Sequence, residues 1–281
     1  MDRHPLISCL CLTRKRPDCL KRAIDCYSSQ TYANKELLVV YHDDDLETRD
    51  FLETILRDDI ISVELPSVPK IPLGEIRNIS ISSSNGEYFC QWDDDDWYHE
   101  NRLEVQMNSL LVNGKEASVM YNWLIYDYNC GRAFLSFKAA WAGSLLCKRT
   151  LVSKDIKYPP MNKHEDLHFL IKLFKLKCLY PLVKPTLYIK TFHGNNVFEY
   201  NFFKDITDKS QPLSNEVSEI IKQILNENIR PKEASAMLNS RTVQQDLNFF
   251  HFPVFSKQKL LKSMVSRFIE SARNGFARQY Y

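Results

Sequence analysis

Strand-length apolar segments alternate with amphipathic helical segments along the first third of the chain, and this alternation restricts the possible folds more than any other feature. The apolar segments span residues 6–12, 37–41, 60–65 and 88–92. Between them, helical periodicity gives one apolar face after Asp18, which can cap its helix, and further faces at residues 51–56 and 74–83. Strands and helices that alternate at this length predict an α/β fold of parallel β-α-β units, with helices on both faces of the sheet.

The second half of the chain has a less regular pattern. We expect a helix over residues 165–177, a strand over 185–192, and a hairpin with strands at 119–126 and 134–137. From about residue 205 onward the sequence is helical and polar, without a strand pattern. The predicted organisation is therefore one domain over residues 1–204 and a helical C-terminal extension over residues 205–281.

Composition and charge exclude several classes of function. The 37 lysines and arginines nearly balance the 35 aspartates and glutamates, which argues against a protein whose main function is to bind a nucleic-acid backbone. No segment approaches the ~18 consecutive apolar residues of a membrane span, and residues 1–13 lack a signal-peptide cleavage site. The seven glycines rule out a Gly-rich phosphate loop, and the eight cysteines include no C-x-x-C pair that would favour a zinc site. We therefore expect a cytoplasmic protein with buried, reduced cysteines.

Polar segments follow three of the predicted strands at the point where each strand ends. They are residues 13–16, 43–45 and 93–96. Ligands of open α/β sheets collect at the carboxyl ends of the strands, so we expect these segments to form one site.

Four consecutive aspartates, Asp93 to Asp96, are the most informative of these segments. Adjacent carboxylates at the end of a buried strand repel one another, and a cation can compensate this cost. Oxygen ligands suit Mg²⁺ or Mn²⁺, which typically complete their coordination with substrate phosphates. A solvated acidic turn is the alternative, but the flanking Trp92 and Trp97 and the preceding apolar strand favour a metal site.

Two further motifs permit either a structural or a chemical role. Glu165 and Asp166 open a predicted helix, where acidic residues are common for capping reasons alone. Beside a metal-bound phosphate ester, one of these carboxylates could instead be a general base. His193 ends the last predicted strand and is either a structural residue or a nitrogen ligand of the metal.

The order and spacing of these motifs resemble those of the family 2 glycosyltransferases, which have the GT-A fold. The resemblance covers roughly residues 5–200. Six segments carry it: 7–17, 30–37 (similar to Q-T-Y-x-N-x-E), 73–78 followed by 85–88, 93–97 with the D-x-D motif and Arg102-Leu103 downstream, Glu165-Asp166, and 192–196 with the closing histidine. Each segment alone is a weak signal, but six in the right order form a strong one.

The resemblance implies roles for particular residues. Asp95 would bind Mn²⁺ or Mg²⁺, with Asp93 and Asp94 near the ribose, and His193 would be a further metal ligand or a diphosphate contact. Asp166 would be the catalytic base. The remaining donor-binding residues would be Thr13, Arg16 and Arg77, together with Asp43, which stands where the family usually has an Asp-Asp-Gly-Ser turn that contacts the base. Glu165 and Trp141 would face the acceptor, although an ordinary packed tryptophan is an equal alternative for Trp141.

The function implied is a metal-dependent, inverting glycosyltransferase of polysaccharide biosynthesis. It would move a sugar from a nucleotide-diphosphate sugar, with a UDP-sugar favoured, to a hydroxyl of a glycan or lipid-linked glycan. Two alternatives stay open: a metal-dependent nucleotidyltransferase, which would not require Asp166, and a catalytically silent sugar-nucleotide or glycan-binding module, which would have no need of the Glu165-Asp166 pair.

Residues 257–278 combine an apolar helical stripe with six basic side chains and one acidic one. Such a basic amphipathic helix can lie on an anionic membrane surface. Amphipathic helices of globular proteins more often pack on their own domain or on a second subunit, which is the favoured alternative.

Overall fold

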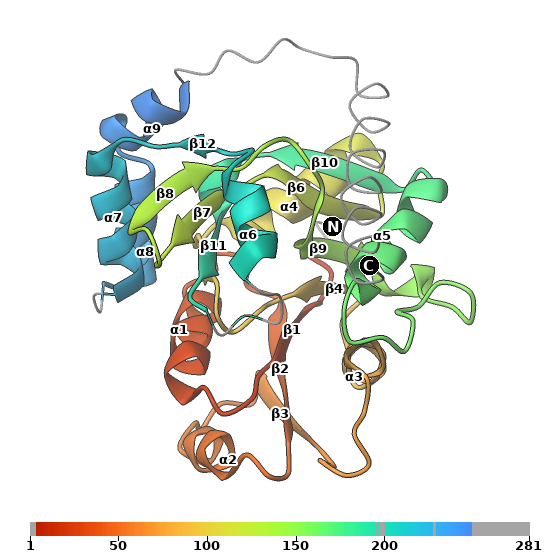
Figure 1. The fold of residues 1–281 in the computed structure, drawn as a ribbon. Coiled ribbons are helices and arrows are strands. Elements are labelled where there is room, and N and C mark those ends of the chain that lie inside the picture. Colours follow the sequence, from red (N-terminus) through yellow and green to blue (C-terminus); the bar gives the residue numbers. More distant parts are fainter. Residues whose placement is uncertain (1–3, 195, 197–199, 227–228, 249–281) are drawn as a thin grey trace, which may run out of the picture.

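The computed structural model describes residues 4–194, 196, 200–226 and 229–248. Two β-sheets organise this part of the chain (Figure 1). A seven-stranded sheet has the order β10-β6-β9-β4-β1-β2-β3, and a five-stranded sheet has the order β12-β8-β7-β11-β5. Among these residues, no helix has both the length and the apolar character needed to cross a membrane.

The first third of the chain forms the parallel β-α-β units that the sequence predicts. The strands are β1 (Ile7–Leu12), β2 (Lys35–His42), β3 (Ile60–Leu65) and β4 (Tyr88–Gln91), and the helices are α1 (Pro17–Ser28), α2 (Leu46–Glu53) and α3 (Leu73–Ser82). β1 pairs in parallel with both β2 and β4, and β2 pairs in parallel with β3.

Alternate residues of these strands belong to two separate hydrophobic cores, one on each face of the sheet. Cys9 and Leu37 pack in the core that contains the apolar side of α1, whereas Leu10 and Leu38 pack in the core that contains α3. Because strand side chains alternate between faces, both faces need a helical cover, and α1 and α3 lie on opposite sides (Figure 1). This explains why the strands are continuously apolar.

The other half of the seven-stranded sheet is mixed rather than parallel. β9 (Trp141–Lys148) runs antiparallel between β4 and β6 (Ala117–Asn122), and β10 (Leu179–Val183) pairs in parallel with β6. The helices of this half are α4 (Arg102–Asn113) and α5 (Glu165–Lys175), and a short 3₁₀ helix, η1 (Arg149–Leu151), follows β9.

The second sheet corrects two of the predicted strands. The strand expected over residues 119–126 is two strands in different sheets, β6 and β7 (Leu124–Asp127), and the hairpin joins β7 to β8 (Arg132–Leu135). The strand expected over 185–192 begins only at β11 (Tyr188–Phe192), because Pro185–Leu187 form a 3₁₀ helix, η2. The short strands β5 (Trp97–Tyr98) and β12 (Gln211–Pro212) complete this sheet at its edges.

The segment after residue 199 is largely helical, as expected. Its helices are α6 (Tyr200–Thr207), α7 (Asn215–Asn226), α8 (Pro231–Leu238) and α9 (Arg241–Asn248). α7 packs on β8, with Val217 and Ile221 fully buried. β12 lies within this segment and pairs with β8, so the division at residue 204 stays a prediction. The amphipathic segment 257–278 lies outside the described residues.

Local chemistry corrects the ends of two predicted helices. α1 begins at Pro17, a residue favoured at the first helical position, so Arg16 occupies the N-cap position. Asp18 lies within the first turn and does not cap the helix. α2 begins at Leu46, where Asp45 accepts the backbone N–H of Thr48, and it ends before Leu56, which is 94% exposed.

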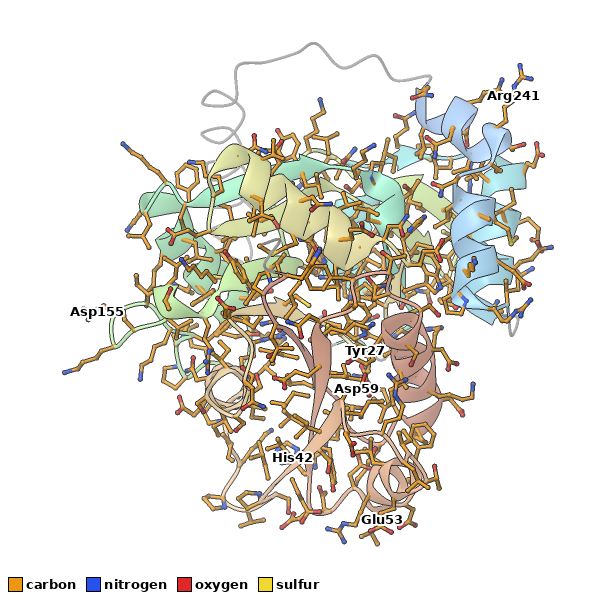
Figure 2. The ribbon with its side chains drawn as sticks, turned by 180° about the vertical axis from the view of Figure 1, so that it is seen from behind. Tyr27, His42, Glu53, Asp59, Asp155 and Arg241 are labelled. Carbon is orange, nitrogen blue, oxygen red and sulfur yellow. The ribbon has the colours of Figure 1, made fainter. Side chains whose placement is uncertain are left out.

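All eight cysteines are free thiols. Six are buried, among them Cys9 and Cys11 on β1, as expected, whereas Cys19 is half-buried and Cys130 is exposed. Beside this core, the Tyr27 hydroxyl of α1 donates to Asp59, which precedes β3 (Figure 2).

Candidate active site

A cavity of about 540 Å³ opens where β1, β2 and β4 end, at the edge of the sheet that the sequence indicated. Nine of the eleven predicted site residues line it: Thr13, Arg16, Arg77, Asp93, Asp94, Asp95, Trp141, Glu165 and Asp166. The cavity therefore lies between the loop after β4 and the start of α5.

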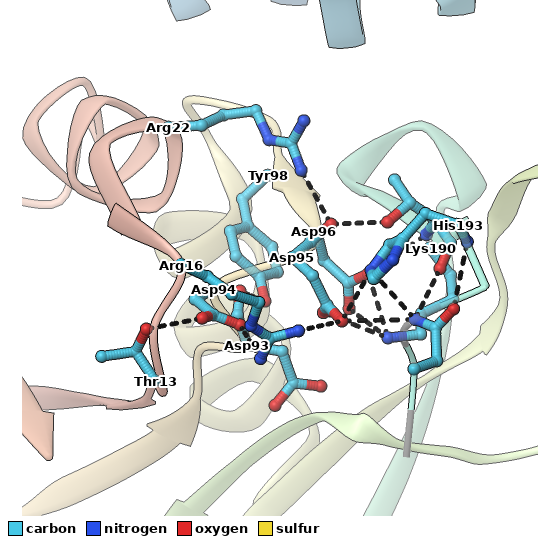
Figure 3. A network of polar contacts seen from close by, with 12 residues as sticks. Thr13, Arg16, Arg22, Asp93, Asp94, Asp95, Asp96, Tyr98, Lys190 and His193 are labelled. Carbon is cyan, nitrogen blue, oxygen red and sulfur yellow. Dashed lines mark hydrogen bonds and ion pairs between the residues drawn. The ribbon is translucent and has the colours of Figure 1, made fainter. Parts of the chain in front are cut away.

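The aspartates after β4 are held by residues from distant parts of the chain (Figure 3). Asp94 accepts hydrogen bonds from the Thr13 hydroxyl at 2.7 Å and from the Arg16 guanidinium at 2.7 Å. Both donors come from the polar segment that follows β1. Two strand ends predicted to meet are thus joined through Asp94.

Asp95 has a positively charged or polar neighbour at each carboxylate oxygen. Its Oδ1 lies 3.4 Å from the Lys190 ammonium, and its Oδ2 lies 3.3 Å from Arg16. The His193 Nε2 and the Asn196 amide nitrogen each lie 3.2 Å from the same Oδ2 (Figure 3). His193 therefore reaches the carboxylate that the sequence paired with it, although its strand belongs to the other sheet.

Asp96 is fully buried and is bonded entirely within the protein. It accepts the Tyr188 hydroxyl, the Lys190 ammonium at 3.1 Å and the Thr191 backbone N–H at 3.1 Å, all from β11. These contacts fasten the β4 loop to the second sheet. Asp96 thus differs from Asp93 and Asp95, whose carboxylates face the cavity.

The backbone of Asp95 is also held. Its carbonyl oxygen accepts the Thr191 hydroxyl at 2.6 Å and the Arg22 guanidinium at 2.8 Å (Figure 3). Arg22 also donates to the Leu225 carbonyl at 3.2 Å, so α1 connects α7 to the aspartate loop. This connection fixes the direction of the Asp95 side chain.

Burial and neighbouring charges shift the pKa values of these carboxyl groups in different directions. Burial raises the pKa of Asp94 to about 6 and that of Asp96 to about 7. Burial would also raise the pKa of Asp95, but the Lys190 ammonium, His193 and Arg16 outweigh it and hold that pKa below its usual range. Asp95 is therefore held in its ionised form.

The donor set fits a hard divalent cation. Ligand oxygens of Asp93, Asp95 and Asp96 lie within 4.8 Å of one another, and the four carboxylates outnumber Arg16 and Lys190, the lysine and arginine that form ion pairs with them among the described residues. Carboxylate oxygens are preferred ligands of Mg²⁺ and Mn²⁺. Because Asp96 is hydrogen-bonded to β11, Asp93 and Asp95 are the members of this group that can bind such an ion on the cavity side.

A second acidic pair faces this cluster from the start of α5. The Arg77 guanidinium of α3 binds Glu165 Oε1 at 3.0 Å, and it also donates to Gln91 at the end of β4. Asp166 is partly exposed, and its Oδ1 accepts the backbone N–H of Leu167 at 2.7 Å. Burial raises the pKa of both acidic residues, and Arg77 opposes this shift.

Close backbone packing holds α5 against α3. Gly74, in the first turn of α3, donates its N–H to the Met161 carbonyl at 2.9 Å. A Cβ at Gly74 would lie 1.8 Å from the Pro159 carbonyl oxygen, so only glycine permits this approach. The contact places the loop before Glu165 at the cavity.

Trp141 is part of the cavity wall and is anchored on two sides. Its Nε1–H donates to the Tyr188 hydroxyl at 3.0 Å, and its ring stacks on Trp123 with centroids 4.9 Å apart. Next to it, a Cβ at Gly143 would lie 2.9 Å from the Trp141 Nε1 and 3.2 Å from Asp93 Oδ2. Glycine thus leaves room for the ring beside the carboxylate.

Asp43, the predicted base contact, lies elsewhere. It is exposed, and its carboxylate accepts the backbone N–H of Ser67 at 2.9 Å. His42 lines the cavity instead, and its buried Nδ1 has no hydrogen-bond partner among the described residues. The part of Asp43 in donor binding stays a prediction.

Sequence reasoning missed Lys190 and Arg22. One signal for Lys190 was available, because a lysine inside an apolar strand needs a buried partner. Arg22 gave no such signal, since a charged residue on an amphipathic helix is ordinary.

Comparisons with known proteins give a matching family and similar solved structures. The model of glycosyl transferase family 2 matches residues 8–158. The solved structure of S. aureus TarS 1-349 in complex with UDP-GlcNAc is 13% identical to the chain with a TM-score of 0.56, and the match covers 94% of this chain and 81% of that one. The mannosyltransferase PcManGT from Pyrobaculum calidifontis, in complex with GDP-Man and Mn²⁺, is 14% identical with a TM-score of 0.53, and the match covers 98% and 88% of the two chains.

No curated protein is significantly similar in sequence. The structural likenesses confirm the GT-A fold that the sequence predicts.

Proposed function

The chain belongs to glycosyl transferase family 2 and is a glycosyltransferase, and from this premise we propose that it catalyses metal-dependent transfer of a sugar to a hydroxyl acceptor with inversion at the anomeric carbon. The donor would be a nucleotide-diphosphate sugar, with a UDP-sugar favoured. The acceptor would be a glycan or a lipid-linked glycan, as in polysaccharide biosynthesis.

One observation carries the proposal: a single cavity is lined by Asp93 and Asp95 on one side and by Asp166 on the other. Transfer in one displacement needs positive charge at the leaving diphosphate and a base at the attacking hydroxyl, on opposite faces of the sugar. The two acidic groups of the cavity come from different elements and match these two requirements.

Asp93 and Asp95 would hold Mn²⁺ or Mg²⁺, which when bound supplies Lewis-acid stabilisation of the diphosphate. Arg16 and Thr13, already bonded to Asp94, would orient the nucleotide, and His193 would support Asp95 as a metal ligand or a diphosphate contact. Likeness to structures holding UDP-GlcNAc, or GDP-Man with Mn²⁺, supports a nucleotide-sugar site and a divalent ion.

Asp166 would accept the proton of the attacking hydroxyl. Two features support this role: its carboxylate faces the cavity, and its pKa is raised by burial, which makes it a stronger base than a free aspartate. Arg77 and Glu165 would fix the start of α5, with Glu165 and Trp141 beside the acceptor.

The first test is the melting temperature with UDP, GDP, TDP and CMP, each with Mn²⁺ or with EDTA. A ligand that binds only the native state raises the melting temperature, and we expect one diphosphate to do so more strongly with Mn²⁺. Sugar esters of that nucleotide are then assayed for transfer or hydrolysis. No shift at millimolar concentration would favour a glycan-binding module, and consumption of nucleoside triphosphates with release of pyrophosphate would favour a nucleotidyltransferase.

A further inference from the structure

Lys190 lies inside the cluster of aspartates and takes no part in the transfer proposed above. Its side chain is 8% exposed, and its ammonium lies 3.1 Å from Asp96 and 3.4 Å from Asp95 Oδ1. It also lines the cavity. Lys190 therefore contacts both the buried carboxylate of the cluster and the one that faces the ligand site.

Asp96 does not depend on Lys190 alone. The Tyr188 hydroxyl and the Thr191 N–H also bind it, so two neutral donors of β11 satisfy the same carboxylate. The geometry leaves the ammonium shared with Asp95, whose other oxygen already contacts Arg16 and His193. A lysine that served only as the counter-charge of Asp96 would have no need to reach Asp95 or the cavity.

A fixed positive charge at this position has two opposite electrostatic effects. It repels a divalent cation held by Asp95 and Asp93, and it attracts the diphosphate of a donor that enters the cavity. Both effects act over a few ångströms in a partly buried site, where solvent screens them only weakly.

We propose that Lys190 is a built-in cation of the donor site, which supplies part of the positive charge for a nucleoside diphosphate and weakens binding of a divalent cation before the nucleotide arrives. This inference rests on the proposed function, because it presumes a diphosphate donor in the cavity. Nucleotide and metal then bind cooperatively, since the diphosphate cancels the charge that repels the ion.

The test compares the D96N variant with the K190M/D96N double variant. Removing Lys190 alone would leave Asp96 buried without its cation and would destabilise the fold, so K190M is not used by itself. In the double variant the buried charge and its counter-charge are removed together, and D96N is the matched protein that retains the lysine. A melting curve of each variant verifies folding.

Two measurements are made on each protein. Paramagnetic resonance of free Mn²⁺ gives the affinity of the nucleotide-free protein for the metal, and calorimetry gives the affinity for UDP, with GDP in parallel, in EDTA and in saturating Mn²⁺. Relative to D96N, we expect the double variant to bind Mn²⁺ about 3- to 10-fold more tightly and to bind the nucleotide in EDTA about 10-fold more weakly. In saturating Mn²⁺ the nucleotide affinities should differ less.

Unchanged affinities for both ligands would overturn the inference and leave Lys190 as the counter-charge of Asp96. Weaker Mn²⁺ binding in the double variant would also overturn it, because Lys190 would then organise the metal ligands rather than repel the ion. If the wild-type protein binds neither UDP nor GDP with or without Mn²⁺, the proposed donor site itself fails, an outcome distinct from the first two.

Discussion

The two acidic walls of the cavity are supported very differently. On one wall Asp94 and Asp95, and behind them the buried Asp96, receive donors from the loop after β1, from β11 and from the residues that follow it, and each of them has at least two partners. On the other wall, Arg77 is the one cation that binds Glu165 within the described chain, and Asp166 accepts local backbone N–H groups there.

This difference separates a binding role from a proton-transfer role. Carboxylates whose oxygens are held by cations and hydrogen bonds keep a fixed position, which suits the preorganised binding of an ion or a diphosphate. Burial raises the pKa of Asp94 and Asp96 as well, but the oxygens of both are occupied by several donors. Asp166 combines a raised pKa with few partners, and such a carboxylate is better suited to accept a proton.

The sharpest test is the substitution of Asp166 by asparagine. The change keeps the shape of the side chain and removes the base, so we expect kcat to fall about 10²- to 10⁴-fold. Nucleotide affinity should stay within about twofold, because the donor wall is untouched. D155N, at an exposed aspartate (Figure 2), is the control. An unchanged rate of transfer in D166N would show that Asp166 is not the base.

Removing Arg77, the cation that binds Glu165, should lower the free energy of unfolding. The R77M variant leaves Glu165, 4% exposed, without its cation, and we expect a loss of about 3–5 kcal/mol in unfolding free energy by urea denaturation. The loss should be smaller at pH 5 than at pH 8, because Glu165 can then fold protonated and its pKa in the folded state is already raised.

The matched control for Arg77 is Arg49, which pairs with Glu64 at the surface, where R49M should cost no more than about 1 kcal/mol. Equal losses for the two variants would contradict the claim that Arg77 compensates a buried charge.

The pH dependence of the wild-type enzyme follows from the raised pKa of Asp166. The base must be ionised to act, so kcat/KM should fall as the pH decreases through a pKa above that of a free aspartate. The measurement is kcat/KM against pH at saturating Mn²⁺, within the range in which the melting temperature is constant. The residual activity of D166N should lack this acidic limb, and its persistence there would assign the limb to another group.

The smallest expected effect concerns Trp141. W141A removes an aromatic face, and we expect the KM for the acceptor to rise about 3- to 10-fold while hydrolysis of the donor by water stays constant. W141F keeps an aromatic ring but loses the hydrogen bond to Tyr188, so it separates stacking from positioning. A rise in donor KM alone would place Trp141 on the donor side.

Local patterns in the sequence were sufficient for much of this structure. Alternation of strands and helices predicted β1 to β4 and the helices between them, and it placed Asp93 to Asp96 at the end of a strand. The start of α5 at Glu165 could also be predicted. These features depend on neighbours in sequence, through side-chain periodicity and helix-start chemistry, and such information is present in any short segment.

Which residues meet across the cavity depends on contacts between distant parts of the chain. Lys190 contacts carboxylates that lie about 95 positions earlier in the chain, and β9 is inserted antiparallel between two strands that precede it in sequence. Residues 119–126 divide between two sheets for the same reason, since pairing depends on partners distant in sequence.

The end of β2 shows at a single residue how far local sequence patterns can predict the site. Side chains alternate along the strand, so Val40 and His42 face the cavity, whereas the predicted Asp43 lies just beyond the strand and does not. The sequence was enough to predict that polar side chains follow β2. Which side chain faces that site was decided by the position of the strand end, which is fixed by pairing with β3.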